Sequence, residues 1–272
     1  MKVVLQDGVW REDGRVCLDA DDLALARGLG VFETMRSYEG GLPLVDAHLA
    51  RLSASAAALG LPWPGSALLE DELRRCLVRA RSRPGLVPEL RLRLGLTPTT
   101  RYIVAQALEP APSSVRAVTR PHPTQPWLSG RVKHISRAGS VLAVREAAVD
   151  EVIWVGPQGE LLEGTWSNVF AVKGGALLTP SDDGRILAGV TRAQILAQAR
   201  VLGIPVQEAP FRRPTDVDEL YISSSLKLLC PIVELDGVPA RGAGLIGQSI
   251  NAALGAELAK LGRAWAQARA QA

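Results

Sequence analysis

The stretch Ile186-Leu187-Ala188-Gly189-Val190-Thr191-Arg192 says most about how this chain folds. Its glycine lets the backbone approach another group closely, and the pattern that follows predicts an amphipathic helix over residues 191–202. The first N–H groups of a helix have no acceptor within it, and they lie at the positive end of its dipole. The stretch is therefore a candidate anion site, although threonine is also an ordinary helix cap, and the segment alone favours the cap.

Two further polar segments become informative only beside this stretch. Ser223-Ser224-Ser225 follows the strand-like Leu220-Tyr221-Ile222 and offers hydroxyl and backbone donors, but a serine cluster by itself is typical of a loop. Glu163 precedes Gly164-Thr165 at the end of a predicted strand, where its carboxylate is well placed to meet a ligand nitrogen. Taken alone, Glu163 favours a carboxylate in a surface turn.

Lysine is scarce in this sequence, which narrows the search for a reactive amine. The 31 basic residues include only Lys2, Lys133, Lys173, Lys227 and Lys260. Lys133 lies in a strand-like stretch over residues 131–136, and burial would disfavour its charged form and make it a nucleophile. Lys227 is the competing candidate, although its leucine neighbours predict a residue on a helix surface. The remaining three are expected in solvent, and without further context a surface position is favoured for Lys133 as well.

Composition argues against several classes of function. The 272 residues carry 31 basic and 28 acidic side chains without a basic block, and the net charge of +3 gives little support for binding nucleic acid or a membrane surface. Three cysteines lie far apart without a CxxC pair, so we expect a reducing compartment and neither a disulfide framework nor a metal site. No apolar run approaches the ~18 residues of a membrane span. We expect a cytoplasmic protein that acts on a small molecule.

Hydrophobic periodicity and turn residues predict two domains separated by a proline-rich segment. A small N-terminal α/β domain is expected over residues 1–115, a connection over 116–125 and a larger C-terminal domain over 126–272. The predicted strands cover residues 3–10 (a hairpin), 31–38, 89–96, 102–108, 114–119, 151–155, 168–172, 176–179, 219–223 and 232–235. The predicted helices cover residues 23–27, 46–59, 66–81, 141–148, 191–202 and 247–270.

Six segments, in this order along the chain, resemble the fold type IV family of pyridoxal-phosphate enzymes. That family includes branched-chain and D-amino-acid aminotransferases and aminodeoxychorismate lyase. The resemblance implies an α/β (α+β) fold, in which a small N-terminal α/β domain precedes a larger cofactor-binding domain with a barrel-like mixed sheet. The segments are Arg27-Gly28-Leu29-Gly30-Val31-Phe32-Glu33-Thr34, His48-Leu49-Ala50-Arg51-Leu52, Lys133 with Val141-Leu142-Ala143-Val144-Arg145-Glu146-Ala147, Glu163-Gly164-Thr165-Trp166-Ser167-Asn168-Val169-Phe170, Leu187-Ala188-Gly189-Val190-Thr191-Arg192, and residues 223–232.

The resemblance also implies roles for individual residues. Lys133 matches the lysine that joins pyridoxal 5'-phosphate and moves protons, and Glu163 matches the residue that keeps the pyridine nitrogen protonated. Arg51 matches the arginine that binds the cofactor phosphate. The other phosphate contacts are expected from Gly189, Val190, Thr191, Ser224 and Ser225. Thr34 is a candidate for a hydroxyl near the moving proton, and Arg101 and Arg137 are candidates for binding substrate carboxylates.

Within this family the segments around the lysine look most like aminodeoxychorismate lyase. Lys133-His134-Ile135-Ser136-Arg137 and Val31-Phe32-Glu33-Thr34 carry that likeness, whereas Ser224-Ser225-Leu226 departs from it by having serine where the lyases have asparagine. The leading expectation is elimination of pyruvate from 4-amino-4-deoxychorismate to give 4-aminobenzoate. An aminotransferase for branched-chain or D-amino acids is the enzymic alternative, and a phosphate-ligand binding scaffold is the non-enzymic one. By analogy with the family we expect a homodimer.

Overall fold

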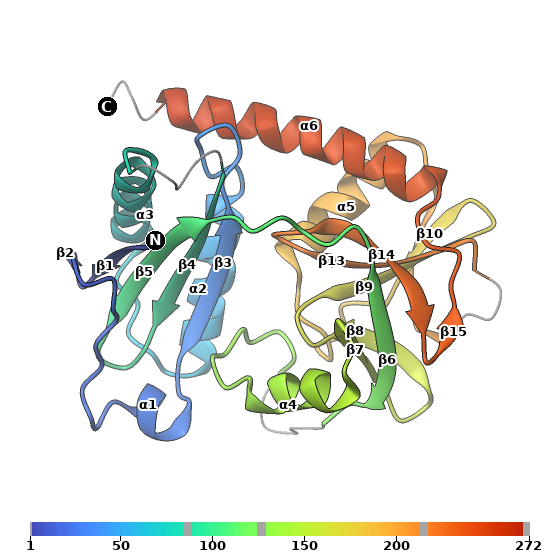
Figure 1. Cartoon of the computed structure of the whole chain (residues 1–272), viewed down its shortest axis with the longest axis horizontal. Coiled ribbons are helices and arrows are strands. Elements are labelled where there is room, and N and C mark those ends of the chain that lie inside the picture. The colour runs from blue at the N-terminus through green and yellow to red at the C-terminus, as the bar shows by residue number, and fades with distance from the viewer. Residues whose placement is uncertain (1, 84–88, 124–128, 213–216, 269–272) are drawn as a thin grey trace. The chain divides into compact units, whose positions relative to one another are not determined.

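The computed structural model describes residues 2–83, 89–123, 129–212 and 217–268, and these residues form two compact units (Figure 1). The first unit comprises Met1–Pro110, Val132–Ser136 and Glu257–Ala272, and the second comprises Ala111–Arg131 and Arg137–Ala256. This division differs from the expected domain ranges in three respects: the second unit begins at Ala111, so that residues 116–121 lie in a strand of that unit rather than in a connection, and Val132–Ser136 and the C-terminal segment belong to the first unit. Both segments pack within the first unit, because Ile135 pairs with Gly30 through the backbone and Gly262 lies against Tyr38 and Gly41.

The first unit is built on a five-stranded antiparallel sheet in the order β2-β1-β5-β4-β3. Its alternating sequence places one set of side chains, such as Leu90, Leu92 and Leu94, in a core under two helices. The strands are β1 (Lys2–Gln6), β2 (Val9–Trp10), β3 (Val31–Arg36), β4 (Leu90–Leu96) and β5 (Arg101–Ala107). The helices are α2 (Val45–Ala58), which contacts β3, and α3 (Ser66–Arg81), which contacts β1, β4 and β5.

The short helix α1 (Leu23–Arg27) confirms a local prediction from the sequence. Asp22 caps it by accepting a hydrogen bond from the Ala24 N–H at 2.7 Å, and Gly28 ends it in the left-handed region at φ 72°. The other oxygen of Asp22 accepts a hydrogen bond from the Thr97 hydroxyl at 2.7 Å. The cap therefore also fastens α1 to the turn between β4 and β5.

A closed six-stranded mixed barrel dominates the second unit. The strand order is β9-β13-β14-β6-β7-β8, and pairing of β8 with β9 at Glu163 and Asn168 closes it. Small and branched apolar side chains, among them Val169, Ile222 and Ile232, fill its interior. The barrel strands are β6 (Val115–Pro121), β7 (Glu151–Val155), β8 (Glu160–Gly164), β9 (Asn168–Lys173), β13 (Glu219–Ser224) and β14 (Leu228–Leu235).

Further strands and helices extend the second unit. Its helices are α4 (Ala138–Ala147), which contacts β7, α5 (Val190–Val201), which contacts β11 and β13, and the part of α6 (Leu245–Ala268) that ends at Ala256. Buried Glu219 accepts hydrogen bonds from the N–H groups of Ile246 and Gly247 and so caps α6. The added strands are β10 (Ala176–Thr179), β11 (Val206–Glu208), β12 (Phe211–Arg212) and β15 (Val238–Pro239). Among the described residues, no helix combines the length and apolarity of a membrane span.

Two local predictions around the candidate lysines are wrong. Lys227 lies in the turn between β13 and β14 rather than on a helix, because the preceding serines end β13 and the leucines after it form β14. The stretch around Lys133 is not a regular strand. In place of regular strand pairing, His134 forms an isolated β-bridge with Val31.

Candidate active site

Lys133 lies beside β3, the strand that follows α1 in the first unit. Its carbonyl accepts a hydrogen bond from the Phe32 N–H at 3.0 Å, and its own N–H donates to Ser55 Oγ of α2 at 3.2 Å. The ammonium Nζ lies 4.9 Å from the centre of the Phe32 ring. Gly30 permits this close pairing, because a Cβ there would lie 2.8 Å from Ile135. The half-buried Lys133 is therefore positioned through its backbone on both sides.

Arg51 is held by a buried carboxylate on the neighbouring strand. Glu33 of β3 is fully buried and accepts two hydrogen bonds from Arg51, from Nε at 2.7 Å and from Nη2 at 2.8 Å. His48, one turn earlier on α2, lies 2.8 Å from Glu33 through Nδ1. The planar guanidinium is thus fixed by a two-point contact, as expected of a residue that presents its charge in one direction.

The protonation states of this trio follow from its geometry. Burial alone would raise the pKa of Glu33, but the charge of Arg51 and the hydrogen bonds from His48 and Arg51 lower it to about 2. Burial lowers the pKa of His48, and the charges of Arg51 and Lys133 lower it further against the opposing effect of Glu33. Since Glu33 is ionised and can only accept, the neutral His48 donates from Nδ1.

The other two candidate residues of the first unit, Thr34 and Arg101, lie in different surroundings. Thr34 lies two residues after Phe32 on β3, so both side chains are on the same face of the sheet. Arg101 instead makes a two-point ion pair with Glu72 of α3, with Nη2 at 2.9 Å from the carboxylate, and lies 3.8 Å from Asp7. The substrate-binding role of Arg101 stays a prediction. In this structure its ion pair with Glu72 joins β5 to α3.

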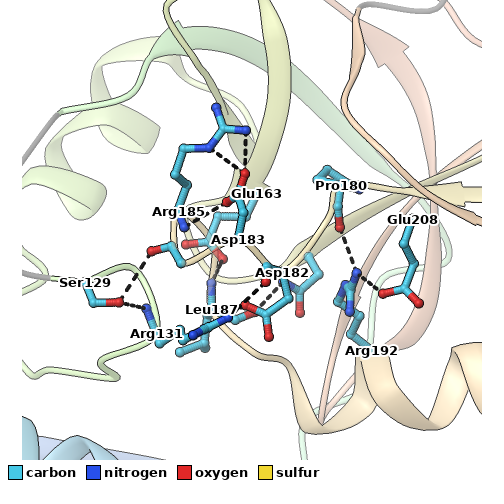
Figure 2. Close-up of polar contacts among 12 residues, drawn as sticks. Ser129, Arg131, Glu163, Pro180, Asp182, Asp183, Arg185, Leu187, Arg192 and Glu208 are labelled. Carbon is cyan, nitrogen blue, oxygen red and sulfur yellow. Dashed lines mark hydrogen bonds and ion pairs between the residues drawn. The ribbon is translucent and has the colours of Figure 1, made fainter.

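Glu163 lies where the barrel of the second unit closes. It pairs with Asn168 across β8 and β9, and its Oε2 accepts a hydrogen bond from the Leu187 N–H at 2.8 Å (Figure 2). Asn168 donates from Nδ2 to the Leu187 carbonyl at 3.0 Å. Glu163 and Asn168 therefore hold both the N–H and the carbonyl of Leu187. Leu187 lies two positions before Gly189, the residue that precedes the helix.

The loop before that helix is braced by arginines (Figure 2). Arg131 donates to the side chain and the carbonyl of Asp182, both at 2.9 Å. Arg185 pairs with Asp183 and Glu160, and buried Arg192 donates to the Pro180 carbonyl at 2.7 Å and to Glu208 at 3.0 Å. These contacts give the loop over residues 180–187 a defined path into α5.

The start of α5 and the β13–β14 turn meet in the second unit. Gly189 is the residue that precedes the helix, no side chain caps it, and a Cβ there would run into the Asn168 side chain. The Thr191 hydroxyl lies 3.4 Å from the Ser225 hydroxyl, so the two segments converge. Val190 and Thr191 are buried, and Ser224 ends β13. Helix N–H groups and hydroxyls at one place are the donors that a phosphate group requires.

Arg137 and the turn after Glu163 form a second polar group in this unit. Arg137 donates to the Thr165 carbonyl, and its guanidinium lies 5.5 Å from the centre of the Trp166 ring. Burial lowers the pKa of Arg137, and the charges of Glu163 and Glu151 act in the opposite direction. Its Nε is buried and has no hydrogen-bond partner among the described residues.

Sequence reasoning missed Glu151, the fully buried carboxylate behind this turn. It accepts hydrogen bonds from the hydroxyls of Thr165 and Ser167, the latter at 2.8 Å. Burial raises the pKa of Glu151 against these hydrogen bonds and the charge of Lys227. Gly164 leaves room for it, because a Cβ there would lie 2.8 Å from the Glu151 carboxyl carbon. The only signal for Glu151 in the sequence was its position as an acidic residue at the start of a strand whose other side chains are apolar.

Glu33 and His48 lie in motifs that carry the family resemblance, but the sequence alone assigned no role to either residue.

Comparison with known proteins shows the family to which the chain is similar. The family model for amino-transferase class IV matches residues 30–235. A D-alanine aminotransferase of Listeria monocytogenes is 30% identical over 264 residues, covering 88% of this chain and 89% of that protein. A bifunctional aminodeoxychorismate lyase / D-amino acid transaminase of Mycobacterium tuberculosis is 32% identical over 275 residues, covering 86% and 91%. The crystal structure of a Brucella abortus aminotransferase bound to PLP has a TM-score of 0.85 at 25% identity and covers 95% of this chain and 99% of that one.

The chain belongs to the class IV aminotransferase family. It is therefore an enzyme with pyridoxal phosphate as its cofactor, and the fold type expected from the sequence is confirmed. This excludes the non-enzymic scaffold.

The residues present fit that cofactor. The second unit offers an uncapped helix start with converging hydroxyls for a phosphate, and a carboxylate held at a defined position for a ring nitrogen. The first unit offers a fixed guanidinium and a half-buried lysine.

Proposed function

We propose that the protein is a pyridoxal-phosphate-dependent 4-amino-4-deoxychorismate lyase, which eliminates pyruvate and releases 4-aminobenzoate. The observation that carries this proposal is the placement of Thr34. Its hydroxyl is on the same face of β3 as Phe32, whose ring lies against the Lys133 ammonium. The kinship with a bifunctional lyase and transaminase supports the same reading.

Each residue then has a defined task. When bound, pyridoxal phosphate supplies an aldehyde that joins an amine and a ring that withdraws electrons. Lys133 would hold the cofactor and then take up the ring proton next to the substrate amine, and Thr34 would donate a hydrogen bond near that proton. Glu163 would accept a hydrogen bond from the protonated pyridine nitrogen.

Each phosphate-binding residue has its own role in this proposal. Arg51 would pair with the cofactor phosphate while Glu33 fixes its orientation. Gly189 would allow the phosphate to approach the backbone of Val190 and Thr191, with Ser224 and Ser225 supplying further donors. Arg137 and Arg101 stay candidate contacts for substrate carboxylates.

The direct test is product analysis. Purified protein loaded with pyridoxal phosphate is incubated with aminodeoxychorismate, and pyruvate and 4-aminobenzoate are measured. Both should form faster than with free cofactor, and pyruvate no faster than with cofactor alone would overturn the lyase assignment. Lys133→Ala should lose the product and the visible absorbance of the bound cofactor, whereas Lys260→Ala, which removes an exposed ammonium, should keep both.

A transaminase acting on D-amino acids is the second candidate, because the similar Listeria protein is a D-alanine aminotransferase. The branched-chain alternative is tested in the same way. Adding each D- or L-amino acid without an acceptor should convert the bound cofactor to its amine form if the transaminase assignment is right. A protein that eliminates pyruvate but shows no such conversion is a lyase alone.

Assembly and location remain predictions. A homodimer should show twice the 29.0 kDa mass of the chain in light scattering after size-exclusion chromatography. A cytoplasmic location is expected from the sequence and can be checked by cell fractionation.

A further inference from the structure

Trp166 is a large aromatic residue of the second unit whose side chain is open to solvent. Its exposed fraction is 43%, although tryptophan is a residue that proteins bury to a high degree on average. Trp166 lies in the turn between β8 and β9, three positions after Glu163. Ligand sites are lined by aromatic side chains together with a few polar groups, so an exposed indole at this point of the chain is a candidate ligand contact.

Hydrogen bonds on both sides of Trp166 fix the path of this turn. The Thr165 hydroxyl donates to Glu151. The Ser167 hydroxyl donates to the same carboxyl group at 2.8 Å, and the Ser167 carbonyl accepts a hydrogen bond from the Gly164 N–H at 2.7 Å. Because both neighbours of Trp166 are held, its backbone is already ordered before a ligand arrives, which lowers the entropic cost of binding.

Arg137 places a positive charge beside the Trp166 ring. The carbon of its guanidinium lies 5.5 Å from the centre of that ring, and one guanidinium nitrogen donates to the Thr165 carbonyl. The Nε of Arg137 is buried and has no hydrogen-bond partner in the part of the chain that the structure describes. A buried donor without a partner is costly, and a carboxylate would satisfy it with a charge-assisted hydrogen bond.

A second pair of tryptophan and arginine provides a comparison. In the first unit, the Arg79 guanidinium lies 4.4 Å from the centre of the Trp10 ring. Arg79 also donates to Glu12 at 2.5 Å, and this carboxylate supplies its counter-charge. The pair in the first unit therefore already has its anion, whereas Arg137 has a free donor for one.

We propose that Trp166 is a specificity-determining residue, which stacks on a planar ring of the substrate while Arg137 pairs with a carboxylate attached to that ring. The inference deepens the proposed function and rests on it in one respect, since Glu163 is taken to mark the cofactor site. Stacked rings have centres about 4.5–7 Å apart. The 5.5 Å between the guanidinium and the indole centre is similar, so a ring acid can contact both groups at once. An open-chain amino acid offers the carboxylate but no aromatic face.

The test compares two six-membered ring acids, of which one is planar and the other is not. Dissociation constants of benzoate and cyclohexanecarboxylate are measured by calorimetry with the cofactor-loaded protein. We expect the native protein to bind benzoate more tightly, and Trp166→Leu to reduce the ratio of the two affinities by about threefold to tenfold. Trp166→Phe keeps an aromatic face and should retain part of the preference. Trp10→Leu, which removes the other arginine-paired indole, is the matched control and should leave the ratio unchanged.

Arg137→Gln tests the carboxylate contact separately. It should weaken the binding of both acids by about tenfold or more, because each has the same carboxylate, and should leave a preference for benzoate. Unweakened binding of both acids by this variant would overturn the pairing with Arg137.

Three outcomes would overturn the role of Trp166: equal binding of both acids by the native protein, an unchanged ratio in Trp166→Leu, or an equal change of the ratio in Trp10→Leu. Failure of the proposed function is distinguishable. In that case the cofactor-loaded protein releases no pyruvate from aminodeoxychorismate, whereas the preference for benzoate and its loss in Trp166→Leu are measured without turnover.

Discussion

Two buried carboxyl groups, Glu33 and Glu151, have pKa values that are shifted in opposite directions. Glu33 has a guanidinium and an imidazole as partners, and its pKa is lowered. Glu151 has two hydroxyls, and burial raises its pKa. The difference lies in the charge of the partners, since both side chains are fully buried.

Glu33→Gln should destabilise the protein near neutral pH by on the order of 3 kcal/mol, because it leaves Arg51 without its counter-charge. The lowered pKa of Glu33 means that its stabilisation is present above pH 4.5, the ordinary value, and is lost as pH falls towards about 2. Urea unfolding at several pH values measures this. Equal acid sensitivity of native and variant protein would contradict it.

Glu151→Gln should behave in the opposite way. A raised carboxyl pKa contributes stability below the ordinary value of 4.5, and that contribution is lost as pH rises above it. The uncharged variant should therefore be at least as stable as the native protein at pH 8, and the difference should shrink towards pH 4.5. Melting temperatures across this range check the sign. A large loss of stability in Glu151→Gln at pH 8 would refute it.

At the scale of elements, the closing strand pair of the barrel organises the candidate cofactor residues of the second unit. Glu163 of β8 and Asn168 of β9 bind the N–H and the carbonyl of Leu187, and that residue leads into α5. Glu163 and Leu187 are 24 positions apart in the sequence, but a hydrogen bond joins them in the fold. Barrel closure therefore sets the direction in which α5 presents its first N–H groups.

Gly189→Ala should weaken cofactor binding by about tenfold or more and destabilise the protein by about 1–3 kcal/mol. Its methyl group would displace the Asn168 side chain from Leu187, an overpacking effect. Cofactor titration followed by absorbance and a urea curve measure the two effects. Gly255→Ala, in open space on α6, is the control and should be neutral or slightly stabilising. Equal behaviour of both variants would argue against the role of Gly189.

At the scale of the whole molecule, each of the two compact units carries candidate residues of its own. Lys133, Arg51 and Thr34 belong to the first unit, whereas Glu163, Thr191 and Ser225 belong to the second. The chain crosses from one unit to the other on both sides of Val132–Ser136.

Removing pyridoxal phosphate should lower the stability of the protein, because a ligand that binds only the folded state stabilises it. At a free cofactor concentration of 100 times its dissociation constant, the bound form should be more stable by about 2.7 kcal/mol. Thermal unfolding with and without cofactor measures the shift. Lys133→Ala should show a smaller shift than the native protein, and an identical shift would mean that Lys133 makes no contribution to binding.

The sequence by itself determined most of the local elements and the family. The spacing of apolar residues, the caps around α1 and the order of six motifs depend on neighbours along the chain, which is why these predictions agree with the structure. Tertiary structure alone decided that Val132–Ser136 packs in the first unit, that Lys227 lies in a turn, and that Arg101 is paired with Glu72. It also brought Arg137 to the Trp166 ring. Such contacts depend on burial and charge between residues far apart in sequence, and no local pattern specifies which partners meet.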